Sequence, residues 1–299
     1  MAVELSAEDE TRPGRTGRTS RVAVLLATGV VAMALALSRK RLPQAQAYFD
    51  FADRRMLAGV PNAMDVLSNL AFAVVGIAGL TALRRGRISL RDARERGPWA
   101  VFFAGVALTS VGSAWFHLGP ANDSLVWDRV PMTVAFMGLL CALVAERVSP
   151  AWGVRLLGPL VLAGAASVAW WIVTERADAG DLRPYLLVQY YPLACVLLVL
   201  ALFPSRYGGA AGWVAGLGLY AGAKWAEVAD VPIFEATGRA LSGHTLKHLL
   251  AAAGIAVLLA MLVRRRPRAP GRVQAGDEGV RAAGDPASRQ AQANPPART

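Results

Sequence analysis

Apolar segments of about bilayer length follow one another along this chain, separated by short polar connections. A helix needs about 20 apolar residues to cross the hydrocarbon core of a membrane, where each backbone polar group must be satisfied inside the protein. Hydrophobic residues make up 55% of the 299 positions, which is more than an ordinary soluble domain contains. The sequence therefore predicts an all-α integral membrane protein, with segments near 22–38, 64–83, 99–117, 124–146, 154–173, 185–203, 209–226 and 244–263.

The ends of the chain differ from this pattern, because they are polar and have no apolar periodicity. The predicted parts are a disordered tail over 1–20, an extra N-terminal transmembrane segment or signal anchor over 21–41, a seven-span membrane domain over 42–263, and a disordered basic cytoplasmic tail over 264–299. Arg21 before the first apolar run and Ala34-Leu-Ala36 within it fit a cleaved signal peptide. The basic residues at 39–41 fit a retained anchor equally well, and both alternatives stay open.

Basic residues give the chain a net charge of +11, and their positions indicate how it is oriented. The arginines lie in tails and short connections, without the interleaved aromatic residues of a nucleic-acid surface, so we expect a membrane partner and no nucleic acid. The arginine-rich connections at 84–98 and 264–268 predict a cytoplasmic side, while 118–123, 174–184 and 227–243 are neutral or acidic and predict the outer side. Only 39–63, with five basic residues, departs from the rule. The Ala, Gly and Arg bias favours a bacterial cell membrane, and no obligate protein partner is inferred.

The three histidines of the chain, His117, His244 and His248, each lie at the end of an apolar segment. His244 and His248 are one helical turn apart on one face, and the predicted orientation brings all three to one depth near the outer leaflet. Three imidazoles that leave one position open are typical of a catalytic zinc site. The alternative is that each histidine caps or pairs within the bundle.

Two polar residues are predicted near the histidines. Asp128 begins the next apolar segment after a turn, and an unpaired ionised aspartate in a span costs roughly 2.5–3.5 kcal/mol. It either pairs with Arg129 or acts as the general base for a zinc-activated water. Ser113, one turn before His117, either packs between helices beside Gly112 or assists at the reaction centre. This chemistry hydrolyses amides and esters, and a site inside a membrane implies a lipid substrate.

Other polar residues at this end have structural interpretations. Lys247 lies between two histidines of one helix, so it is predicted to face away from the metal and to snorkel or pair with Glu227 or Asp230. Asp65 is predicted to cap a helix, and the Ser68-Asn69 pair that follows it to form hydrogen bonds between helices.

Three motifs in order carry a resemblance to a known family: Gly112-Ser-Ala-Trp-Phe-His117, Asp128 with Pro131-Met132, and His244-Thr-Leu-Lys-His248. Together they resemble the CREST superfamily of seven-span membrane hydrolases, with its alkaline ceramidase branch as the nearest match, over about 50–263. The resemblance implies that the three histidines bind zinc, that Asp128 activates the zinc water and that Ser113 assists. The implied reaction is hydrolysis of the amide of ceramide to a sphingoid base and a fatty acid.

The resemblance also implies a calcium site before the first of the seven spans. Asp50-Phe51-Ala52-Asp53 fits the opening of the family pattern, which makes Asp50, Asp53 and Asn62 the candidate Ca²⁺ ligands. Arg55 stands where the family has an amide, and the later carboxylate is replaced by Asn62 or displaced to Asp65. An arginine beside a hard cation is unfavourable, so the alternative is that the two aspartates pair with Arg54 and Arg55.

Other functions share some of these features. A lipid ester hydrolase or GPI-lipid-remodelling enzyme of the same superfamily has the same metal constellation, and the Asp-x-x-Pro-Met run is reminiscent of it. A lipid-binding protein like the progestin and adiponectin receptors is a third alternative, although those receptors place the N-terminus of the matching spans inside. A proton or ion transporter is disfavoured because the expected pairs of broken helices are missing.

Overall fold

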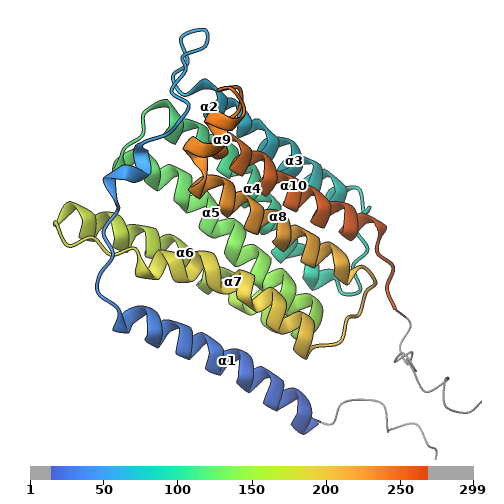
Figure 1. Cartoon of the computed structure of the whole chain (residues 1–299). Helices are drawn as coiled ribbons and strands as arrows, with labels where there is room; N and C mark the ends of the chain where they lie inside the picture. The colour runs from blue at the N-terminus through green and yellow to red at the C-terminus, as the bar shows by residue number, and fades with distance from the viewer. Residues whose placement is uncertain (1–14, 269–299) are drawn as a thin grey trace, which may run out of the picture. The chain divides into compact units, whose positions relative to one another are not determined.

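The computed structural model describes residues 15–268, with side chains from residue 17, so most of both predicted tails lies outside the described residues. In this part of the chain all regular elements are helical, apart from two isolated β-bridges, which confirms the predicted all-α class (Figure 1). The long helices are α1 Arg15–Ser38, α3 Leu70–Arg84, α4 Arg96–Leu118, α5 Asn122–Leu143, α6 Pro150–Arg176, α7 Arg183–Leu202, α8 Ala210–Val228 and α10 Gly243–Arg264. The short ones are η1 Gln46–Phe49, α2 Ala63–Ser68, η2 Ala93–Glu95, η3 Val144–Val148 and α9 Asp230–Ala236.

Seven helical stretches of the described chain are long and apolar enough to cross a membrane, which indicates a multi-pass membrane protein. They are Gly17–Ser38, Ala63–Arg84, Ala93–Leu118, Asn122–Val148, Pro150–Arg176, Arg183–Leu202 and Gly243–Arg264. The predicted segment at 209–226 forms α8 but is not among them. Several glycines together with Lys224 and Glu227 lower the mean hydropathy of α8, and these two charged residues lie in the cavity described below.

Two predicted boundaries were wrong. Helix α1 begins at Arg15, inside the predicted tail over 1–20, because each added residue extends its hydrogen bonding and Arg18 donates to the carbonyl of Val148. Order also continues past 264, since the buried Arg265 pairs with Glu146 at an Nη1 to Oε2 distance of 2.5 Å. Both departures come from contacts with distant parts of the chain, which local sequence does not show.

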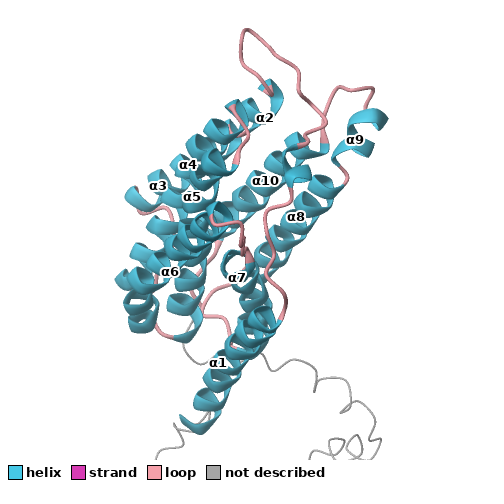
Figure 2. Ribbon diagram, turned by 90° about the vertical axis from the view of Figure 1, so that its left-hand side faces the viewer, coloured by secondary structure: helices cyan, strands magenta, loops and turns pink. Residues whose placement is uncertain are grey.

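The bundle places α2, α9 and the loop over 39–62 at one end, as both views show (Figure 1, Figure 2). We call this the α2 end. Helices α3, α4, α5 and α6 pack as successive neighbours, and α10 packs on α8 and α3. Glycines bring some helices unusually close, since a Cβ on Gly105 of α4 would lie 2.5 Å from the backbone nitrogen of Ala135 on α5.

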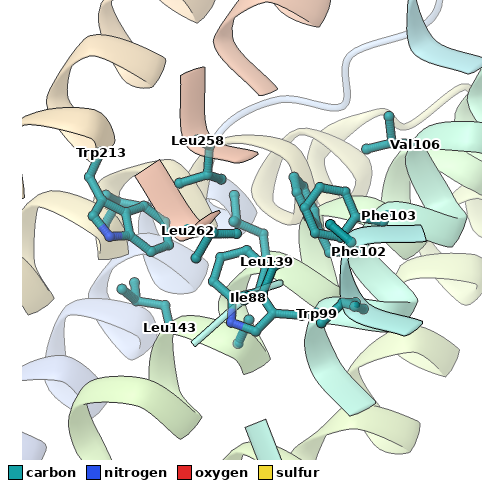
Figure 3. Close-up of a cluster of buried hydrophobic side chains, with 14 of the residues drawn as sticks. Ile88, Trp99, Phe102, Phe103, Val106, Leu139, Leu143, Trp213, Leu258 and Leu262 are labelled. Carbon is teal, nitrogen blue, oxygen red and sulfur yellow. The ribbon is translucent and has the colours of Figure 1, made fainter. Parts of the chain in front are cut away.

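Apolar side chains fill the bundle in two clusters. The larger lies toward the end opposite α2 and includes Trp99, Phe103, Leu143 and Leu262, as Figure 3 shows for its centre. The smaller surrounds Phe116 near the α2 end, with Phe51, Leu125, Val168, Trp171, Ile172, Leu182 and Tyr185. The polar site therefore lies at one end of a bundle that is closed by apolar packing at the other.

Candidate metal centre

The three histidines meet at the α2 end. His117 lies in the last turn of α4, and His244 and His248 lie in the first turns of α10. All three are buried, the Nε2 atoms of His117 and His244 are 3.2 Å apart, and the potential ligand atoms of the three all lie within 4.8 Å of one another. In the described chain they are the only group of three or more His, Cys, Asp or Glu residues that meet in this way. The predicted convergence is confirmed, and the cluster can hold a metal ion.

Hydrogen bonds prepare His248 to bind through Nε2. The Ser68 hydroxyl donates to the carbonyl oxygen of Asp65 at 3.0 Å and lies 2.7 Å from Nδ1 of His248. Because its hydrogen is already used, the hydroxyl accepts from Nδ1–H, which leaves the lone pair on Nε2. That Nε2 is buried and has no partner among the described side chains and backbone atoms. The predicted bond between helices is thus present for Ser68, whereas Asn69 bonds to Asp65 within its own segment.

The distance between imidazoles fits a tetrahedral metal. Two nitrogens bound to one zinc at 2.0–2.1 Å with tetrahedral geometry lie about 3.3 Å apart. The observed distance between Nε2 of His117 and Nε2 of His244 is 3.2 Å. Donor type, burial and this distance therefore suit a metal ion held between the imidazoles.

The start of α10 is fixed by hydrogen bonds to polar side chains. Ser242 caps the helix and accepts from the Thr245 N–H at 2.9 Å, and Asp65 accepts from the Thr245 hydroxyl at 2.6 Å. Asp230 accepts from the backbone N–H of His244 at 2.7 Å, where a carboxylate also suits the helix dipole. Asp65 was predicted to cap its own helix, but Asn62 holds that position and the Asp65 carboxylate stabilises α10 instead.

Asp128 and Ser113 meet on neighbouring helices. Both are buried, and both line the cavity that also contains His248. Arg129 forms no ion pair with Asp128 within 4.0 Å in the described structure, since its guanidinium turns to Gln44 and to aromatic rings. The direct Asp128–Arg129 pair considered from sequence is therefore not formed.

Lys247 approaches the histidines more closely than predicted. Its Nζ lies 3.1 Å from Oε1 of Glu227, which confirms one of the two predicted partners, but also 2.9 Å from Nε2 of His244. The prediction that it faces away was wrong, because residues three apart on a helix are neighbours and the long side chain reaches across the turn. Lys224 also bonds to Glu227, so an ion-pair cluster adjoins the metal centre.

Phe51 covers the metal centre and was not recognised as part of it. Its buried ring lies 4.9 Å from the ring centre of His117 and 4.5 Å from that of His244. It belongs to the loop before α2, and Tyr48 and Phe49 of that loop pack on Phe116. The only signal in the sequence was a run of aromatic residues within a charged connection.

The candidate calcium ligands do not form one cluster. Asp50 is exposed and pairs with Arg54 at 2.9 Å, while Asp53 pairs with Arg55 at 2.6 Å. The hydrogen bond from Arg55 holds the pKa of Asp53 below its ordinary value. Asn62 instead donates from Nδ2 to the His117 carbonyl oxygen at 2.8 Å. The alternative of arginine pairing is the arrangement that the structure has.

A cavity of about 330 Å³ runs from the metal centre into the bundle. Its polar end contains Ser113, Asp128, Arg129, Lys224, Glu227, Lys247 and His248. Along α5 it continues past Ala135 to Leu139, and along α10 to Leu258, so it extends about 16 Å at the helical rise of 1.5 Å per residue. This shape suits a ligand with a polar head and an apolar chain.

A scan against protein-family models found no matching family, and a search of curated proteins found no match. Functional inference therefore depends on the geometry of the site and on the residue pattern.

Proposed function

We propose that this protein is a zinc-dependent intramembrane hydrolase that cleaves the amide bond of ceramide-type lipids to a sphingoid base and a fatty acid. The observation that carries the proposal is the convergence of three buried imidazoles, of which His248 lines a long apolar cavity together with Asp128. The resemblance to alkaline ceramidases supports the same reaction. The proposal includes a bacterial cell membrane, which the Ala, Gly and Arg bias supports, and an active site toward the outer face with a cytoplasmic C-terminus, which the loop charges support.

In this proposal each residue has a distinct task. His117, His244 and His248 hold zinc through Nε2, and the ion, when bound, supplies Lewis-acid polarisation of a carbonyl and lowers the pKa of water to about 7. Asp128 takes the proton from the attacking water and returns it to the leaving amine. Ser113 lines the same cavity as Asp128 and assists at the reaction centre. Phe51 excludes bulk water from the imidazoles, which strengthens electrostatic interactions within the site.

The proposal does not include calcium. Arg54 and Arg55 already neutralise Asp50 and Asp53, and a hard cation would have to displace both guanidinium groups. Zinc is therefore the only cofactor proposed.

The test uses the full-length protein purified in detergent. Metal analysis should find one zinc per chain in the wild type and a loss of zinc in His244→Ala. Asp128→Ala should retain zinc but lose amide cleavage by roughly 10²–10⁴-fold, because it removes the general base. Product release is measured on a panel of ceramides, phytoceramides and ester lipids.

Asp123→Ala is the matched control, since Asp123 is an exposed carboxylate near the same end that pairs only with Arg176 in the described structure. It should keep both zinc and activity. Full zinc retention in His117→Ala would contradict the ligand set. Cleavage of esters alone would favour the remodelling alternative, and zinc binding without any cleavage would favour the receptor alternative.

A further inference from the structure

Arg129 is a buried cation at the polar end of the cavity. The residue is only 5% exposed, and its guanidinium carbon lies 4.1 Å from the ring centre of Trp171 and 4.6 Å from that of Tyr185. Nη2 donates to Oε1 of Gln44 at 2.6 Å. Aromatic faces and an amide hold the guanidinium in place but do not neutralise its charge.

One nitrogen of this guanidinium remains available. Nη1 of Arg129 is buried and has no hydrogen-bond partner among the described residues, and no carboxylate lies within ion-pair distance in this part of the chain. Leaving a charged donor buried and unsatisfied is costly, most of all at membrane depth. An oxygen anion in the cavity would satisfy it, since guanidinium groups match carboxylates and phosphates in geometry.

The charge of the cavity points to the same class of ligand. Its lining contains three cationic side chains, Arg129, Lys224 and Lys247, and two carboxylates, Asp128 and Glu227. Three minus two leaves one positive charge, before any metal is bound. Glu227 bonds to both lysines, whereas Arg129 has no ion-pair partner within 4.0 Å among the described residues.

We propose that the cavity binds an acyl lipid through an anionic oxygen group, and that Arg129 is the residue that binds it. The acyl chain extends along the apolar part of the cavity toward Leu139 and Leu258. The anionic group has two possible sources, the carboxylate of a fatty acid or the phosphate of a lipid headgroup. The first source rests on the proposed function, because a fatty acid is its product, whereas binding at Arg129 does not require hydrolysis.

The experiment measures binding by titration calorimetry of the full-length protein in detergent, at mildly alkaline pH. The probes are palmitate, hexadecyl phosphate and uncharged hexadecanol, which share a chain length and differ in the head. Wild type should bind the preferred anionic probe at least about tenfold more tightly than hexadecanol, as expected for a charge-assisted bond. Preference for palmitate or for the phosphate identifies the source of the anion.

Variants then assign the effect to one side chain. Arg129→Gln should remove the preference for the anion while hexadecanol binding stays unchanged, and Arg129→Lys should restore part of it. Arg155→Gln is the matched control, because Arg155 also stacks on a tryptophan but is exposed at the surface. It should bind all three probes as the wild type does.

The binding of an anion by Arg129 and the proposed hydrolase activity can fail independently of each other. Equal affinity of wild type for all three probes overturns it, as does an unchanged preference in Arg129→Gln. His244→Ala should still prefer the anionic probe. If amide cleavage is never detected while Arg129 controls this preference, only the proposed hydrolase fails.

Discussion

Ser68, the last residue of α2, links this helix to the candidate metal centre. Its hydroxyl accepts a hydrogen bond from Nδ1–H of His248, so a single small side chain selects the tautomer that presents Nε2 to a metal. Partners of this kind tune affinity because they orient the ring and raise the basicity of the ligand.

Replacing Ser68 with alanine should therefore weaken zinc binding by about 10–100-fold, the range typical for such partners. Zinc affinity is measured by competition with a chelator in detergent. Ser167→Ala is the matched control, because Ser167 is also a buried helical serine but bonds to its own helix at Gly164. Equal zinc affinity in the two variants would show that Ser68 plays no part in orienting the ligand.

At the residue scale, the sequence could predict which residue types bind a metal, but it could not predict where every side chain near them points. Histidine is rare and costly inside a membrane, so three histidines at the ends of apolar segments are enough to indicate a shared metal. Lys247 and Phe51 could not be placed in this way. The direction of Lys247 depends on Glu227 of another helix, and the position of Phe51 depends on how a loop folds over the bundle.

At the scale of elements, the crossing of α4 and α5 sets the geometry of Ser113 and Asp128. A Cβ on Gly112 would lie 1.9 Å from the carbonyl oxygen of Trp127, a backbone atom that cannot rotate away. Small residues at such crossings allow the two backbones to approach. Because Gly112 and Trp127 each precede one residue of the pair, the spacing of these helices fixes the distance between hydroxyl and carboxylate.

Gly112→Ala should separate the two helices, destabilise the protein by about 1–3 kcal/mol and slow amide cleavage by roughly 10²-fold through misplacement of Asp128. Zinc content should fall far less, since two of the three ligands lie on α10. Thermal unfolding, metal content and initial rates are measured together. Gly97→Ala serves as the comparison, because no atom lies within 4 Å of its added Cβ. If the two variants had the same rate, this crossing would not control the site.

The positions of the membrane-spanning helices can be predicted from hydropathy for a physical reason. A span must be long, apolar and helical, so seven of the eight predicted segments were recovered as helices that can cross a membrane. Helix α8 shows the limit of this argument. Its Lys224 and Glu227 lower its hydropathy but pair with each other within the helix. Glu227 also pairs with Lys247 of α10, a contact that no local window contains.

At the scale of the whole molecule, the residues proposed for catalysis and a network of buried ion pairs that stabilises the fold lie at opposite ends of the bundle. The α2 end holds the metal centre, and the opposite end holds a buried charge network. There Arg265 pairs with Glu146 and lies over the ring of Tyr207, whose hydroxyl donates to Glu95 at 2.5 Å. These groups come from η3, η2 and connections far apart in sequence, so their pairing closes the end of the bundle where the apolar cluster around Trp99 lies.

Breaking this pair should affect stability and leave the site intact. Glu146→Gln leaves the Arg265 guanidinium buried without its carboxylate, a change that typically costs about 3–5 kcal/mol, so we expect a clearly lower Tm in detergent. Zinc content and the rate of amide cleavage, measured well below the unfolding transition, should match the wild type. The double variant Glu146→Leu with Arg265→Met should recover only part of the lost stability, since it leaves no unpaired charge at 265 but still removes the carboxylate that the buried Arg147 faces at 3.9 Å. A loss of zinc in Glu146→Gln at a temperature where the protein stays folded would contradict this separation, because it would show that the two ends are coupled through the bundle.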